Sequence, residues 1–342
     1  MAGRRRRGTW WWLLSLAALL FVAQSCGGTA AAETTSHTGS LTKVVLATGF
    51  TPSMNFAPYY LAAARGYYRQ QGIDLKIQDG ANSGLLEQVG RGQIDFGVTS
   101  GDSLLLAAAN GIPDVMVMQQ FTSYPVGAIS LSSGKVSIGS PKDLRGLRIG
   151  VSAPNGSTYF GLQALLQAGG LTLRDVDVVS VGFTELEALS GGQVDAAMTY
   201  LNNEPVQAQS EGIRVNQLPV SRYRDLVSQG LVASRTMTRE HPDLVRRFVK
   251  ATLEGLQAAH RDPGAAAQAA LVRMPGLTQQ ETTQQHQTLT STQHFEQPQE
   301  SHPLGWLNPS AWSGTASFLQ GAGVLKGTVT PSRCYTNQFI GS

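Results

Sequence analysis

The side chains best suited to hold a small molecule are polar and aromatic residues in loops that follow predicted strands. They are Asn55, Tyr59, Ser100, Asp102, Tyr124, Asn155, Ser157, Thr158, Tyr159, Tyr200, Asn203 and Glu204. Aromatic rings stack on flat ligands, while amides and a carboxylate bond the edge of a heteroaromatic ring. These residue types therefore predict noncovalent binding of a heteroaromatic small molecule.

Several of these residues also have a purely structural interpretation. Tyr59 is followed by a second tyrosine, so one of the two rings is expected in the core. Asp102 is as well suited to cap a helix as to touch a ligand, and Asn155 precedes a glycine, as in many turns. Glu204 has no evident local partner in the sequence, and the alternative for it is a surface ion pair.

Sequence motifs of the common enzyme classes are absent. The sequence has no G-x-S-x-G elbow, no Walker A loop and no G-x-G-x-x-G after a predicted strand. None of its six histidines has another histidine four positions away, so a helical metal site is not indicated. Cys334 has no histidine or basic cluster nearby that would favour a thiolate. We therefore expect a binding protein without catalytic residues, metal or cofactor.

An internal repeat indicates how the binding residues are positioned. Gly92 to Gly101 reads GQIDFGVTSG and Gly192 to Leu201 reads GQVDAAMTYL, with the aspartates and threonines exactly one hundred positions apart. Both copies predict a short helix, a turn and a strand. In open α/β sheets, ligands bind beyond the carboxyl ends of the strands. Two similar lobes are thus expected, with Ser100 and Tyr200 at facing strand ends.

The surrounding pattern alternates strands and helices along most of the chain. It predicts strands at 41–47, 73–77, 94–98, 115–120, 128–131, 147–151, 176–181, 194–199, 213–218 and 230–233. It predicts helices at 57–68, 83–90, 102–110, 140–144, 159–168, 184–190, 242–259, 265–274 and 278–299. This order favours an α/β fold with mostly parallel sheets.

The N-terminus has the features of an export signal. Arg4 to Arg7 precede an apolar run from Trp10 to Val22, which is too short to span a membrane. Cys26 follows this run directly after a small residue, as in a bacterial lipobox, although Ala23 stands where leucine is usual. We expect a signal peptide over 1–25, lipidation of Cys26 and a flexible tether over 26–40. Ordinary signal cleavage near this point is the alternative.

Charge argues against a nucleic-acid partner. The leader holds four of the 26 basic residues and none of the 23 acidic ones, so the remainder is close to neutral. A nucleic-acid-binding surface needs a stripe of positive charge to neutralise phosphates. No such stripe is evident in the sequence.

Several segments resemble one known protein family. Asn55 to Ala62 (NFAPYYLA), Arg65 to Tyr68 (RGYY), Gly92 to Gly97 and Ser140 to Gly150 (SPKDLRGLRIG) are similar to substrate-binding proteins of bacterial ABC importers. The branch includes binders of nitrate, sulfonates, taurine and thiamine-pyrimidine precursors. The resemblance runs from about residue 41 to about 339.

This resemblance implies a two-lobed periplasmic-binding-protein fold joined by two crossover hinges. The predicted first lobe holds 41–124 and 230–342, and the second holds 125–229. The implied protein is exported, either anchored by lipid to the outer face of the cell membrane or periplasmic. It would act as a monomer, close on a small molecule and deliver it to an ABC permease.

Within the family, residues 202–205 (NNEP) resemble the branch that binds riboflavin or the thiamine pyrimidine. By this resemblance, Asn55, Tyr159, Asn203 and Glu204 would contact the ring. Pyrimidine binders and related pyrimidine-synthesising enzymes often have histidine where Phe56 stands, which favours a flavin-like ligand. Alkanesulfonate, taurine or nitrate binding is the alternative, and an enzyme of the same fold is a further one.

Overall fold

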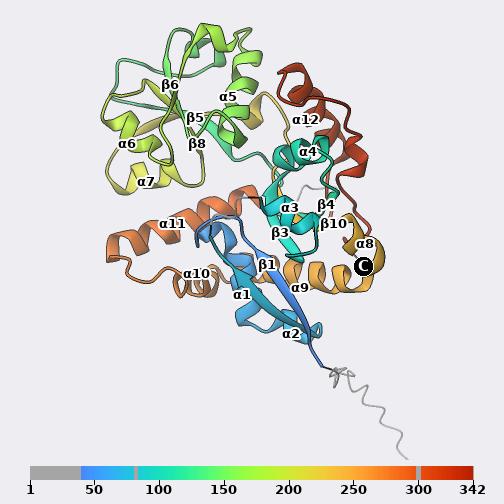
Figure 1. Cartoon of the computed structure of the whole chain (residues 1–342). Helices are drawn as coiled ribbons and strands as arrows, with labels where there is room; N and C mark the ends of the chain where they lie inside the picture. Colours follow the sequence, from blue (N-terminus) through green and yellow to red (C-terminus); the bar gives the residue numbers. More distant parts are fainter. Residues whose placement is uncertain (1–39, 81–83, 298–301, 342) are drawn as a thin grey trace, which may run out of the picture. The chain divides into compact units, whose positions relative to one another are not determined.

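The computed structural model describes residues 40–80, 84–297 and 302–341, so Cys26 and the predicted leader and tether lie outside the described residues. The first sheet contains β1 (Thr42–Ala47), β2 (Ile73–Gln78), β3 (Phe96–Ser100), β4 (Asp114–Gln119) and β10 (Gln229–Ser234), in the order β2-β1-β3-β10-β4. Strands β1, β2 and β3 are parallel, whereas β10 is antiparallel to both of its neighbours. The chain thus returns late in the sequence to fill the first sheet (Figure 1).

The second sheet repeats this plan. It contains β5 (Val126–Leu131), β6 (Arg148–Val151), β7 (Asp177–Ser180), β8 (Ala196–Tyr200) and β9 (Val215–Pro219), in the order β7-β6-β8-β5-β9. Here β5 is the antiparallel strand and pairs with β8 and β9. The expected two-sheet α/β fold is confirmed, but half of the strand pairings in each sheet are antiparallel. The alternating pattern could not show that a distant strand is inserted beside β3 and β8.

The two aspartates of the sequence repeat have equivalent places in the two sheets. The carboxylate of Asp95 accepts the backbone N–H of Val45 in β1 at 2.8 Å, and Asp195 accepts that of Arg148 in β6 at 2.9 Å. Asp195 also pairs with the Arg148 guanidinium, which lowers the pKa of the carboxyl group. Each aspartate therefore joins the start of its own strand to the neighbouring strand. The sequence repeat thus corresponds to the same arrangement in both sheets.

Twelve α-helices connect or cover the described strands. They are α1 (Ala57–Ala64), α2 (Tyr67–Gln70), α3 (Leu85–Gly90), α4 (Gly101–Ala109), α5 (Gly156–Ala168), α6 (Glu185–Ser190), α7 (Glu204–Ser210), α8 (Arg235–Glu240), α9 (Pro242–Arg261), α10 (Pro263–Leu271), α11 (Gln279–Phe295) and α12 (Pro309–Gly321). The helix expected over 57–68 is split because Gly66 has a φ of 73°, which the right-handed helix does not allow. Helices α7, α8 and α12 were not predicted.

The longest helix packs its apolar stripe on the first sheet. Phe248 of α9 stacks on Phe96 of β3 with ring centroids 3.9 Å apart, and Tyr68 adds a third ring. The apolar side chains Val245, Phe248, Val249 and Leu256 of α9 are buried, and Leu244 and Leu253 are half-buried at the edge of this stripe. This packing holds β3, whose carboxyl end carries Ser100, in a fixed place.

The two crossovers between the sheets are tied together by a pair of glutamines. Gln120 follows β4, and Gln229 begins β10. The backbone N–H of Gln120 donates to the Gln229 carbonyl at 2.9 Å, and the Gln229 amide donates to Gln120 Oε1 at 3.0 Å. The Gln120 amide also donates to the Asn55 carbonyl and to the buried Glu296 carboxylate. One side chain thus links both crossovers to the loop after β1.

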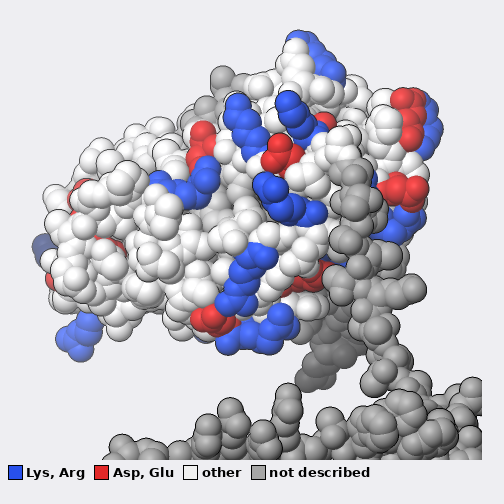
Figure 2. All heavy atoms as spheres, turned by 90° about the horizontal axis from the view of Figure 1, so that it is seen from below, with Lys and Arg blue, Asp and Glu red and all other residues white. Residues whose placement is uncertain are grey.

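Opposite charges are mixed on the described surface. On the face shown in Figure 2, basic and acidic side chains are interspersed. Three ion pairs with exposed side chains among the described residues are Arg65–Asp262, Arg246–Asp243 and Arg239–Glu240. Among the residues that the structure describes, no helix is both long and apolar enough to cross a membrane.

Candidate functional site

Three side-chain contacts join the strand-end loops of the first sheet to those of the second. Asn202, after β8, donates to Asn55, after β1, at 2.8 Å. Ser157, after β6, donates to Asp102, after β3, at 3.0 Å. Phe183, after β7, makes an edge contact with Phe50, after β1, with ring centroids 5.5 Å apart. The carboxyl ends of the parallel strands of both sheets therefore meet at one place, where α/β proteins bind ligands.

Asp102 is the centre of the first polar cluster. It lies in the first turn of α4 and is 1% exposed. Its carboxylate accepts hydrogen bonds from the hydroxyls of Ser100 at 2.5 Å, Tyr124 at 2.8 Å and Ser157 at 3.0 Å, and from the Ser103 backbone N–H at 2.6 Å. A buried carboxylate is tolerated when several donors satisfy it. Asp102 thus holds loops from both sheets together, in addition to any role at the start of α4.

Asn202 is the residue that the sequence interpretation missed. The structure buries it fully, and its amide donates both to Asn55 Oδ1 and to Thr292 Oγ1 of α11 at 2.9 Å. Its Oδ1 atom is buried and has no hydrogen-bond partner among the described residues. Asn203, which was predicted as a contact, is exposed and donates to Glu204. The two adjacent asparagines, Asn202 and Asn203, indicated a polar loop at this place. The hydrophobic periodicity and composition of the sequence could not show which of the two side chains points inward.

Glu204 has a local structural role that the sequence did not reveal. It is the first residue of α7, and its carboxylate accepts the Tyr200 backbone N–H at 2.9 Å and the Asn203 amide at 2.8 Å. No ion pair joins it to any described residue, so the surface-ion-pair alternative is wrong. Burial raises the pKa of Glu204 to about 7, although three hydrogen bonds, from its own backbone N–H, the Asn203 amide and the Tyr200 backbone N–H, act to lower it.

The end of β8 is an acid-rich place. Burial raises the pKa of Tyr200 to about 12, and the negative charges of Asp102, Glu204 and Glu185 add to this shift. Glu185 begins α6, is buried, and accepts a hydrogen bond from the Ser152 hydroxyl. Burial also raises the pKa of Glu185. The three carboxylates have no lysine or arginine partner among the described residues.

The remaining predicted residues divide into three groups. Tyr59 is fully buried, and its hydroxyl donates to Gln120 in the core of the first lobe. Thr158 is buried next to the Ser152 hydroxyl, and Tyr159 is half-buried against Phe160. Asn155 is the exposed N-cap residue of α5, and its side chain makes no capping bond. The structure therefore brings Asn55, Ser100, Asp102, Tyr124, Ser157, Tyr200, Asn203 and Glu204 together, and places Tyr59 in the core.

Phe50 and Phe183 are unusual because large apolar rings seldom remain in water. Phe183 is 78% exposed and Phe50 is 41% exposed. Both rings lie on loops after strands. The N–H of Gly182, the residue before Phe183, donates to the Ser152 carbonyl, and the Phe50 carbonyl accepts a hydrogen bond from the Gly80 N–H. Exposed aromatic rings at such an edge can stack on a flat molecule. Neither ring was among the predicted contacts.

The described ranges hold no group of three or more His, Cys, Asp or Glu side chains that could bind a metal ion. Cys334 is buried and forms no disulfide with any described residue, and burial raises the pKa of its thiol to about 11. Phe56 is buried and makes an edge contact with Tyr60.

Comparisons with known proteins agree with this geometry. Residues 53–266, more than half of the chain, match the profile of a family described as NMT1/THI5 like. The riboflavin-binding protein RibY of Chloroflexus aurantiacus is 33% identical over 306 residues, which cover 88% of this chain and 87% of that protein. The 4-amino-5-hydroxymethyl-2-methylpyrimidine phosphate synthase of Schizosaccharomyces pombe is 24% identical over 237 residues, which cover 66% of this chain and 67% of that protein.

A solved structure identifies the architecture. The periplasmic aliphatic sulphonate binding protein SsuA of Escherichia coli matches with a TM-score of 0.69 at 15% identity, over 85% of this chain and 91% of that one. At this identity, the likeness shows the fold alone. The two sheets thus form a periplasmic-binding-protein fold.

Proposed function

Because the chain belongs to the NMT1/THI5-like family, we propose that it is the substrate-binding component of an ABC importer and captures a neutral heteroaromatic vitamin, with riboflavin as the leading ligand. The observation that carries this proposal is the acid-rich strand-end cluster. Asp102, Glu185 and Glu204 surround Tyr200 without a cation among the described residues. Such a site accepts N–H and O–H donors and repels sulfonates or nitrate.

The ring would lie between the strand ends of the two lobes. Glu204, half-buried, and the exposed Asn203 offer acceptor and donor atoms to the edge of the ring. Tyr159, Phe50 and Phe183 offer ring faces or edges. Asn55 and Asn202 already join the lobes at this place, so small shifts of their amides would exchange protein partners for ligand atoms.

Capture would proceed by closure of the two lobes about the crossovers. Under this proposal the first lobe holds 41–124 and 230–342, the second holds 125–229, and Gln120 and Gln229 tie the crossovers together. The protein performs no covalent chemistry and acts as a monomer. It is exported and anchored through Cys26, and a membrane permease accepts the closed form.

A thermal-shift panel tests the ligand class. The panel contains riboflavin, the thiamine pyrimidine, taurine, an alkanesulfonate and nitrate. A ligand at about 100 times its dissociation constant stabilises the folded state by roughly 2.7 kcal/mol, which is readily measured. We expect a shift with riboflavin and none with the anions. A shift with taurine or nitrate alone would overturn the proposal, and turnover of the pyrimidine precursor would favour the enzyme alternative.

A further inference from the structure

Glu296 is a buried carboxylate that has no role in the function proposed above. It is the C-cap residue of α11, and no lysine or arginine pairs with it among the described residues. Its Oε1 atom accepts a hydrogen bond from the Gln120 amide at 2.8 Å, and its Oε2 atom lies 3.2 Å from His260 Nε2 of α9. Burial raises the pKa of Glu296, while His260 and Gln120 act to lower it. Because burial of a carboxylate is costly unless it is paired, these two partners are what allow it to lie there.

The Gln120 amide uses all of its hydrogen-bonding positions. Its Nε2 atom donates to Glu296 and, at 2.7 Å, to the Asn55 carbonyl. Its Oε1 atom accepts from the Tyr59 hydroxyl at 3.2 Å and from the Gln229 amide at 3.0 Å. Gln120 is 1% exposed, so solvent does not compete for these positions. Each partner therefore has a direct effect on where the amide lies.

The acceptors of the two Gln120 N–H bonds decide which way the amide faces. A backbone carbonyl such as that of Asn55 can only accept, and so can an ionised carboxylate. If the amide turned over, its bonds to Asn55, Glu296 and Gln229 would all be lost. Without the Glu296 carboxylate, one N–H of Gln120 would be buried with no acceptor, and the orientation that serves Asn55 would be less favourable.

Asn55 is the residue through which this orientation reaches the candidate site. Gln120 holds its backbone carbonyl, and its side-chain Oδ1 accepts the Asn202 amide of the second sheet at 2.8 Å. A shift of the Gln120 amide would therefore move Asn55 relative to Asn202.

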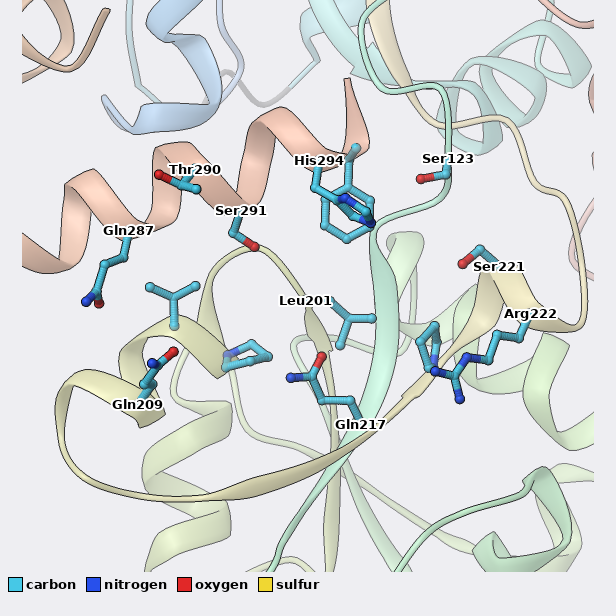
Figure 3. A pocket seen from close by; sticks show the side chains of 14 residues that line it. Ser123, Leu201, Gln209, Gln217, Ser221, Arg222, Gln287, Thr290, Ser291 and His294 are labelled. Carbon is cyan, nitrogen blue, oxygen red and sulfur yellow. The ribbon is translucent and has the colours of Figure 1, made fainter. Parts of the chain in front are cut away.

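The same end of α11 forms a wall of the pocket beside the strand-end cluster. This pocket of about 680 Å³ lies between α11 and α7 with β9 (Figure 3). Its lining includes Phe295, directly before Glu296, and Ser123 of the first crossover. Thr122 donates its backbone N–H to the Phe295 carbonyl at 2.8 Å and its hydroxyl to the same carbonyl at 3.1 Å. The end of α11 and the first crossover are thus bonded to each other where they border the ligand site.

We propose that Glu296, with His260 as its partner, is a positioning residue for ligand capture. It fixes the Gln120 amide so that the loop after β1 presents Asn55 to the second sheet, and it does not touch the ligand. The effect on binding rests on the function proposed above. The positioning itself is a property of the protein without ligand, so it can be measured separately.

Amide hydrogen exchange of the purified protein without ligand tests the positioning. The Gln120 N–H, which donates to the Gln229 carbonyl, reports on the crossovers, and the Phe56 N–H, which donates to the Ser53 carbonyl, reports on the loop after β1. Glu296→Leu removes the acceptor at similar volume, and we expect exchange at both amides to become about tenfold faster. Glu296→Gln keeps an acceptor oxygen and should restore most of the protection. No change in the leucine variant, or no recovery in the glutamine variant, would overturn the proposal.

Gln293→Leu is the matched control. Gln293 lies on the same helix, and its amide donates to the Ala259 carbonyl of α9 at 2.7 Å and not to Gln120. It should leave exchange at both amides unchanged, and an effect equal to that of Glu296→Leu would overturn the proposal. His260→Leu, at a side chain that is 22% exposed, keeps the test decisive if Glu296→Leu does not fold. It should speed exchange at both amides by about threefold, and unchanged exchange would again overturn the proposal.

Riboflavin affinity gives the second measurement. Glu296→Leu should weaken binding by about tenfold, because the apparent affinity falls with the fraction of molecules in which Asn55 is in place. Glu296→Gln and Gln293→Leu should bind like the unchanged protein. Faster exchange without any loss of affinity would overturn the role of Glu296 in capture. If riboflavin does not bind the unchanged protein, the function proposed above fails, and hydrogen exchange still decides whether Glu296 positions Gln120.

Discussion

The Asn202 amide donates to Asn55 Oδ1 across the two sheets, at 2.8 Å. The same amide also reaches Thr292 of α11, so one buried side chain joins three segments that are far apart in the sequence. Gln120 holds the Asn55 carbonyl from the other side. The loop after β1 is thereby positioned by both the second lobe and the crossover.

Asn202→Ala should weaken ligand binding by about 1–3 kcal/mol, because Asn55 Oδ1 and Thr292 Oγ1 lose their shared donor. Titration calorimetry with riboflavin measures this change. Asn110→Ala is the matched control, since Asn110 is exposed and bonds only within its own helix end. Equal affinities of the two variants would show that the bond between the lobes has no role in capture.

Glu204→Gln tests the ring-edge carboxylate. Glutamine keeps an acceptor for the Tyr200 N–H but cannot ionise, and we expect riboflavin affinity to fall by about 1–3 kcal/mol at pH 8, where the carboxylate is charged. The pKa of Glu204 is raised to about 7 in the folded state, so its ionisation costs stability as the pH rises towards and through 7. The variant should therefore lose less stability than the unchanged protein between pH 5 and pH 8. An identical pH profile in thermal unfolding would refute the buried, ionisable state of Glu204.

Asp114 should destabilise the fold at alkaline pH. It is 1% exposed, neither carboxylate oxygen has a hydrogen-bond partner among the described residues, and burial raises its pKa to about 7. Its folded pKa lies above the unfolded value, so stability is fully present below about pH 4 and is lost as the pH rises through 7. Asp114→Asn should raise the free energy of unfolding by on the order of 1–3 kcal/mol at pH 8 and change little at pH 4. Asp243→Asn, at an exposed ion pair, is the control.

Phe183→Ala should weaken binding of a flat ligand without loss of stability. The ring is 78% exposed, so its removal forfeits little burial, whereas a stacked ring contributes about 0.5–1.5 kcal/mol. Affinity for riboflavin should fall by roughly two- to twelvefold, with an unchanged melting temperature. Leu173→Ala removes another exposed apolar side chain of the second lobe and should have no effect on affinity. If both variants bind riboflavin like the unchanged protein, Phe183 does not contact the ligand.

The sequence predicts most strands and the repeat because both depend on local patterns. Asp95 and Asp195 make the repeat visible in the sequence, and the structure gives the two aspartates equivalent backbone bonds. The insertion of β10 beside β3 was not predictable in the same way, because antiparallel pairing across more than a hundred residues leaves no local trace. Tyr59 was assigned to the site because its aromatic ring follows the first predicted strand, but the ring is buried by packing against the rest of the core.

The site could be located from the sequence only to the level of the strand-end loops. The hydrophobic periodicity and composition of the sequence place Asn202 and Asn203 in one loop. The direction of each side chain, however, depends on how α7 begins at Glu204. Thr292 was invisible as a site residue, because the Gln- and Thr-rich α11 reads as a surface helix. Its buried positions Thr288, Leu289 and Thr292 face other segments. The positions of these side chains depend on contacts between segments far apart in the sequence, which local sequence patterns do not predict.

The most direct measurement is isothermal titration of the purified protein with riboflavin and, in parallel, with taurine. The acid-rich strand ends predict a saturable, one-to-one complex with riboflavin and no heat of binding with taurine. Saturable binding of taurine with no binding of riboflavin would contradict the assignment of the site to a neutral heteroaromatic ligand.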